Sequence, residues 1–128
     1  MTDDRKERLM QGKTCLANKR ILKGKCKDEE LIKWAKETGR YLYIGKGSGY
    51  AKEGTSDWFN KPLADNKKKG IKTTNEEAVV LFREYILQEP KLLKRIPELK
   101  GKLLVCWCYP KACHGNVLIE LLEKGLLV

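Results

Sequence analysis

Apolar residues recur at helical spacing in three stretches of the chain. The strongest stripe follows a capping-box pattern at residues 74–77 and continues to a proline at position 90, which predicts a helix between them. A second stripe predicts a final helix over about residues 113–124, with Gly125 as its stop. An upstream stripe follows Asp28, a suitable N-cap, and we expect that helix to end at Gly39.

Apolar and aromatic runs between these helices predict strands. Residues 41–44 and 102–107 are the two secure strands, and residues 14–16 form a short edge strand. We expect a loop or hairpin arm over residues 19–27. Residues 45–72 are rich in glycine and lysine and show no periodicity, so we expect a long loop there.

The alternation of these elements predicts an α/β fold. We expect a small three-layer domain in which helices flank a largely parallel sheet of about three to four strands. Residues 1–38 are expected to form an N-terminal extension with one helix, packed on the same domain. Residues 39–128 form the α/β module itself and contain most of the chemically reactive side chains.

Composition narrows the classes of partner. The chain has 128 residues and a formal net charge of +10, which favours a phosphate-bearing ligand or nucleic acid, although the lysines are dispersed and also suit a solvated surface. Its apolar runs are too short to span a membrane, so we expect no membrane partner. The first ten residues are charged and unlike a secretory signal, which predicts a cytoplasmic protein with five reduced cysteines.

The candidate chemistry is concentrated in residues 103–114, which read LLVCWCYPKACH. On a strand, Cys106 and Cys108 project to the same side. Cys113 and His114 fall at the start of the last helix, where unpaired backbone N–H groups can bind an anion and make a thiol more nucleophilic. Lys111 adds positive charge beside them.

Three interpretations of this stretch stay open. In the first, Cys108 or Cys113 is a nucleophile and His114 is its acid or base. In the second, Cys106, Cys108, Cys113 and His114 bind zinc, although adjacent Cys113 and His114 depart from the usual ligand spacing. In the third, the cysteines are small buried apolar residues and His114 caps a helix.

Three further residues are candidate ligand contacts. Lys46 lies in a glycine-rich GKGSG stretch after the strand at 41–44, where phosphate-binding loops occur, but the spacing is not that of a P-loop and also suits a plain turn. If the two secure strands are parallel, Lys46 approaches the Cys/His stretch. Asp57 and Asn60 are equally suited to polar ligand contacts and to capping a turn.

Three pieces of the chain carry a family resemblance: YIGKG at 43–47, SDWFNKP at 56–62, and the stretch 77–122 with its Cys-x-Cys, proline and Cys-His-Gly. Together they resemble the domain-of-unknown-function 4326 family, small proteins of phages and bacteria. Members tend to have Trp-Gly-Asn-Pro where this chain has Trp58-Phe59-Asn60-Lys61-Pro62. The resemblance supports the fold and the site and implies no established reaction.

The leading hypothesis is a Cys/His crevice that binds or acts on a phosphate-bearing ligand, either a nucleotide or nucleic acid. Cys108 and Cys113 are its candidate nucleophiles, His114 its proton carrier, and Lys46 and Lys111 its charge partners. The alternative is a non-catalytic, zinc-stabilised domain that binds nucleic acid or a host protein. A third hypothesis is an inhibitor that binds a host protein and does not depend on its cysteines.

Overall fold

The chain folds into three layers, with a sheet between two sets of helices. The structure is a computed structural model, and it describes all residues except 1–3, 20, 23–24, 27, 47–53, 108–112 and 125–128. Its helices are α1 (Arg5–Met10), α2 (Glu29–Glu37), α3 (Lys61–Lys68), α4 (Asn75–Leu87), α5 (Pro90–Leu93), the 3₁₀ helix η1 (Ile96–Leu99) and α6 (His114–Lys124). Its strands are β1 (Cys15–Asn18), β2 (Ile21–Leu22), β3 (Lys25–Cys26), β4 (Tyr41–Tyr43) and β5 (Leu103–Cys106).

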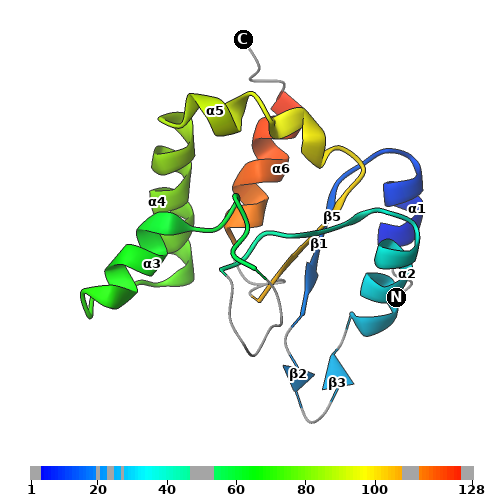
Figure 1. Ribbon diagram of the computed structural model, residues 1–128, viewed down its shortest axis with the longest axis horizontal. Helices are drawn as coiled ribbons and strands as arrows, with labels where there is room; N and C mark the ends of the chain where they lie inside the picture. Colours follow the sequence, from blue (N-terminus) through cyan, green and yellow to red (C-terminus); the bar gives the residue numbers. More distant parts are fainter. Residues whose placement is uncertain are drawn as a thin grey trace.

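The main sheet is parallel and has the order β1-β5-β4. The central strand β5 pairs with β1 in the register Cys15 to Leu103 and with β4 in the register Tyr41 to Leu103. Helices α1 and α2 cover one face of this sheet, and α4 and α6 lie on the other (Figure 1). The separate pair β2-β3 is antiparallel. The predicted α/β class and largely parallel sheet are therefore confirmed.

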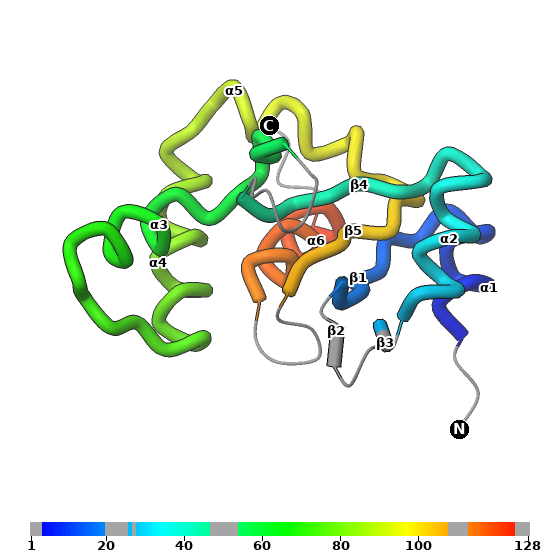
Figure 2. The backbone as a smooth tube through the Cα atoms, turned by 60° about the horizontal axis from the view of Figure 1, so that its bottom comes forward, coloured from blue at the N-terminus to red at the C-terminus, as the bar shows by residue number. Residues whose placement is uncertain are grey.

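Strand β5 is buried over its whole length, as expected for a strand covered on both faces. Because side chains alternate along a strand, Leu103 and Val105 pack toward α1 and α2, whereas Leu104 and Cys106 pack toward α4 and α6. Figure 2 shows β5 passing between these two sets of helices. This alternation directs the thiol of Cys106 toward the start of α6.

Most of the predicted elements are present with small changes at their ends, but residues 1–38, expected to contain one helix, contain both α1 and α2. Helix α4 begins at a complete capping box, in which Thr74 and Glu77 each accept a hydrogen bond from the other's backbone N–H. The predicted hairpin arm corresponds to β2-β3. The predicted edge strand corresponds to β1, which lies at one edge of the sheet. In the described part of the chain, no helix is long and apolar enough to cross a membrane.

One prediction about a helix start was wrong, and a second was right in position but not in the contact that the side chain makes. The region expected to be an unbroken loop contains α3, because Asn60 caps it by accepting a hydrogen bond from Leu63 N–H and Pro62 stands in its first turn. Lys67 and Lys68 therefore lie in the last turn of this helix. Asp28 precedes α2 but makes no side-chain cap, because its carboxylate instead pairs with Arg5 at 2.7 Å and accepts from Asn18 N–H.

Gly115 provides a test of how closely α6 approaches the sheet. A Cβ at this position would overlap the side chain of Leu16 and lie 3.0 Å from Ile44 Cδ1. We expect Gly115→Ala to lower the free energy of unfolding by about 1–3 kcal/mol through overpacking, although alanine is the better helix former. The measurement is urea unfolding followed by circular dichroism.

Gly54→Ala is the matched control, because a Cβ there meets no atom within 4 Å. We expect it to change stability by less than about 0.5 kcal/mol. Equal stability of Gly115→Ala and the unmodified protein would show that α6 can move away from β1 without cost.

Candidate functional site

The candidate site lies at the carboxyl edge of the parallel sheet. Strand β4 ends there and continues into Ile44, Gly45 and Lys46, while β5 ends at Cys106 and continues into Trp107. Helix α6 begins beside these strand ends. In open α/β folds, this edge is where ligands usually bind.

The thiols of Cys106 and Cys113 meet at this edge. Their sulfur atoms are 3.2 Å apart, and both residues are buried. Cys113 also caps α6, because its sulfur accepts from Gly115 N–H at 3.4 Å while its own N–H donates to Asn116 Oδ1 at 3.0 Å. This reciprocal pair resembles a capping box and fixes Cys113 at the helix start.

His114 is held between a carbonyl and a thiol. Its Nε2 lies 2.7 Å from the carbonyl oxygen of Ile44, which can only accept, so Nε2 carries the hydrogen. In the neutral ring, Nδ1 is then an acceptor, and it lies 3.7 Å from Cys113 Sγ. The ring of Phe82 packs edge-on against the imidazole at 4.9 Å. The arrangement lets Nδ1 accept the proton of the Cys113 thiol.

Burial favours this neutral imidazole. His114 is only 9% exposed, and desolvation lowers its pKa below the ordinary value, while hydrogen bonds with the backbone of Ile44 and Trp58 only partly oppose this shift. The imidazole is therefore uncharged at neutral pH.

A pocket of about 580 Å³ opens over this cluster. Its described lining contains three lysines and no carboxylate, and both of its aromatic side chains are half-buried. The residues that line it are Gly45, Lys46, Phe59, Asn60, Leu63, Ala64, Lys67, Lys68, Cys106, Trp107 and His114. Positive charge, apolar surface and a thiol–imidazole floor thus meet in one cavity.

Asn60 has the capping role that the sequence left open, and it also lines the pocket. Besides capping α3, its amide donates to the carbonyl of Ala78 at 3.0 Å, and only 8% of the residue is exposed. Both ends of its amide group are therefore engaged within the protein. Lys46 is exposed, and its carbonyl accepts a hydrogen bond from the hydroxyl of Tyr43 at 2.8 Å.

Asp57 lies apart from the Cys/His cluster. Its carboxylate is exposed and pairs with Arg95 at 2.8 Å. It lines a different cavity of about 380 Å³ beside β4, together with Tyr41, Tyr43 and Trp58. The structure therefore does not bring Asp57 together with Lys46 and His114.

Two predicted site residues, Cys108 and Lys111, lie outside the described residues. Of the four predicted zinc ligands, Cys106, Cys113 and His114 are neighbours. Among the described residues, no three His, Cys, Asp or Glu side chains are arranged to hold a metal ion. The hydrogen bond from His114 Nε2 to Ile44 occupies one of the two nitrogen atoms that could ligate zinc.

Sequence reasoning missed the wall of the pocket that α3 supplies. Lys67 and Lys68 fall in the region expected to be a long loop, and Phe59 was not among the candidate site residues. The available signal was Asn60 followed two positions later by Pro62, a combination typical of a helix start. This signal predicts a helix that begins just after Phe59 and contains Lys67 and Lys68.

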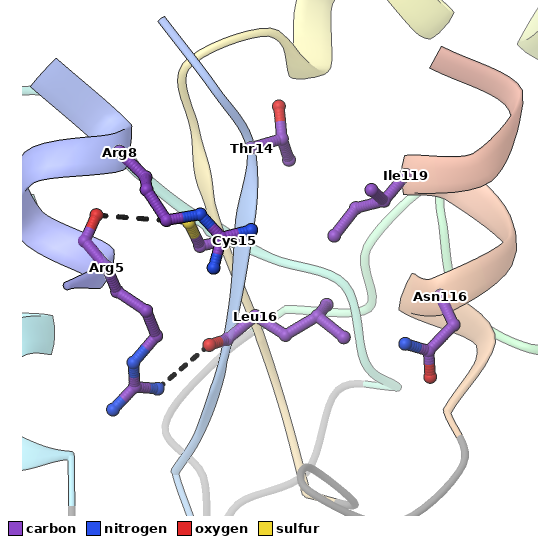
Figure 3. A pocket seen from close by; sticks show the side chains of 7 residues that line it. All are labelled: Arg5, Arg8, Thr14, Cys15, Leu16, Asn116 and Ile119. Carbon is purple, nitrogen blue, oxygen red and sulfur yellow. Dashed lines mark hydrogen bonds between the residues drawn. The ribbon is translucent and has the colours of Figure 1, made fainter. Parts of the chain in front are cut away.

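A smaller cavity of about 220 Å³ lies between α1, β1 and α6 (Figure 3). Arg5 and Arg8 line it, but Arg5 donates to the carbonyl of Leu16 at 2.9 Å and pairs with Asp28. These contacts attach α1 to β1 and to the start of α2. We therefore assign Arg5 a structural role.

The chain was compared with models of protein families. The family described as "Domain of unknown function (DUF4326)" matches residues 25–124, which include β3, α2 and everything through α6. No curated protein and no solved structure matches the chain.

His114 gives a prediction for the pH dependence of stability. It is the only histidine, and folding lowers its pKa. As the pH falls, the imidazole therefore becomes protonated in the unfolded chain before it does so in the folded protein. We expect the free energy of unfolding to fall as the pH drops below about 6.5, with a slope of up to about 1.4 kcal/mol per pH unit. Urea unfolding between about pH 8 and pH 5.5 measures it.

His114→Gln is the comparison variant, because glutamine does not titrate in this range. We expect it to be less stable at pH 8 but to show a flatter profile. A slope that persists unchanged in this variant would contradict the assignment of a buried neutral imidazole.

Proposed function

The chain belongs to the DUF4326 family, whose description assigns no reaction, and we propose from the site that it binds or acts on a phosphate-bearing ligand, a nucleotide or nucleic acid. The observation that supports this most is the pocket at the carboxyl edge of the sheet, where Lys46, Lys67 and Lys68 surround a thiol–imidazole floor.

The lysines suit the phosphate part of such a ligand. They come from two separate segments, the stretch after β4 and helix α3, so their charges converge on the cavity rather than following one exposed helix face. A phosphate group within reach of several ammonium groups gains electrostatic energy that is screened by salt. The overall charge of +10 acts in the same direction.

The aromatic and apolar wall suits the rest of the ligand. Trp107 and Phe59 offer rings against which a nucleobase can stack, and Leu63 and Ala64 add apolar surface. A cavity of about 580 Å³ is within the usual range for small-ligand sites, about 300–1,000 Å³.

A reaction at this site would use the thiol–imidazole pair. His114 Nδ1 takes the proton of Cys113, and the resulting thiolate is stabilised by the N–H groups at the start of α6. Cys108 is the second candidate nucleophile, and Lys111 is a further charge partner, both on the evidence of the sequence alone. We also retain the cytoplasmic location as a prediction, because these roles need reduced thiols.

Charge reversal in the pocket tests the proposal. We expect the double variant Lys67→Glu/Lys68→Glu, and separately Lys46→Glu, to weaken binding of pyrophosphate and of ATP by about tenfold or more, equivalent to about 1.4 kcal/mol, through loss of attraction. Isothermal titration calorimetry at low salt measures the dissociation constants, and a 5′-phosphorylated single-stranded oligonucleotide tests the nucleic-acid alternative.

Lys33→Glu is the matched control for Lys46→Glu, because it makes the same charge change at an exposed position on α2, on the other side of the sheet. An equal loss in this control would mean that only the overall charge matters. Trp107→Ala should weaken ATP more than pyrophosphate if the base stacks there. Failure of the unmodified protein to bind all three probes would reject the proposal.

The zinc-stabilised domain is the second candidate, and the observation that favours it is the proximity of Cys106, Cys113 and His114. Elemental analysis of the purified protein distinguishes the zinc-stabilised domain from the phosphate-binding site. About one equivalent of zinc, together with unfolding in chelator, would favour the structural metal and a role in binding nucleic acid or a host protein.

A further inference from the structure

The thiol pair at the base of the pocket differs from the other described cysteines. Cys15 packs on the opposite face of the sheet with its sulfur toward the carbonyl of Arg5, and the sulfur of Cys26 contacts the carbonyl of Asn18. Cys106 also donates to a carbonyl, that of Ala17 at 3.7 Å, but Cys106 and Cys113 in addition place their sulfur atoms against each other at 3.2 Å. All four are thiols rather than halves of a disulfide.

The two thiols differ in their position relative to the pocket. Cys106 is among the residues that line the cavity, whereas Cys113 lies next to His114 and is not, although both are buried, at 1% and 2% exposed. Their sulfurs need to approach by only about 1.2 Å to reach the length of a disulfide bond, about 2.05 Å. An outer thiol that meets a reagent and an inner thiol that completes the exchange are the two parts that thiol–disulfide chemistry needs.

We propose that Cys106 and Cys113 form a redox-active dithiol that reduces a low-molecular-weight disulfide entering the pocket. The inference goes beyond the proposed function, since the exchange needs no phosphate group. The pocket lysines and the absence of carboxylates from its described lining favour a disulfide that carries carboxylate groups.

The exchange takes place in two steps. Cys106 loses its thiol proton, its thiolate attacks one sulfur of the external disulfide, the S–S bond breaks, and the first leaving thiolate takes up that proton. Cys113 then transfers its proton to His114 Nδ1 and attacks Cys106 Sγ, releasing the second small thiol, which takes up that proton. Overall, two protein thiols are oxidised to one disulfide, and one external disulfide is reduced to two thiols.

The test isolates the pair. The variant Cys15→Ser/Cys26→Ser/Cys108→Ser retains only Cys106 and Cys113 and is incubated with oxidised glutathione. We expect both thiols to disappear together on alkylation counting, and peptide mapping to show a bond between residues 106 and 113 with no lasting glutathione adduct. Hydroxyethyl disulfide, which carries no charge, should react more slowly if the lysines attract the reagent.

Two controls keep the test decisive. Adding Cys113→Ser should stop the reaction at a stable mixed disulfide on Cys106, whereas adding Cys106→Ser should leave Cys113 largely unreacted. Mapping of the unmodified chain covers the case in which a multiple variant does not fold. A lasting adduct on Cys106, or no reaction in the unmodified chain, would overturn the proposal, and loss of pyrophosphate binding with intact exchange would reject only the proposed function.

Discussion

The burial of β5 between two helical layers is the constraint on which the rest of the molecule depends. Four consecutive buried residues, Leu103–Cys106, leave no face of this strand to solvent, so each side chain must match one of two apolar surfaces. Alternation then assigns Leu104 and Cys106 to the α6 side. A shift of one residue in the β1–β5 and β4–β5 registers would send the thiol of Cys106 to the α1 and α2 side, away from Cys113.

The same burial restricts the polar groups near the site to well-defined partners. His114 and Asn60 are both at least nine-tenths buried, and each is bonded to a backbone carbonyl, of Ile44 and Ala78 respectively. Among the described residues, no buried side-chain nitrogen or oxygen lacks a hydrogen-bond partner. Because an unsatisfied buried polar group is costly, these bonds fix the imidazole orientation and the start of α3, and α3 in turn places its lysines at the pocket.

The sequence was sufficient for the sheet and the cluster but not for the pocket wall. Strong periodicity identified α4, α6 and β5, and the parallel strands brought Lys46 toward the Cys/His stretch as expected. Helix α3 is polar and has no buried residue, so it shows no apolar stripe from which it could be predicted. Asp28 stands at the N-cap of α2, but its carboxylate makes no capping bond because it pairs with Arg5, 23 positions away. A pattern of neighbouring residues cannot predict such a distant ion pair.

Cys113 has a structural role at the start of α6, and the proposed chemistry would give it a second one. A helix start needs an acceptor for its N–H groups, and serine, threonine, asparagine or aspartate would fill that role at least as well as a thiol. The thiol is a weaker acceptor than these side chains, so capping alone does not account for cysteine at this position. Its contact with a second thiol is the feature that a hydroxyl or carboxylate at this position could not use for disulfide chemistry. Gly115 completes the arrangement, because its missing side chain lets α6 approach Leu16 and Ile44 closely enough to bring Cys113 to the edge of the sheet.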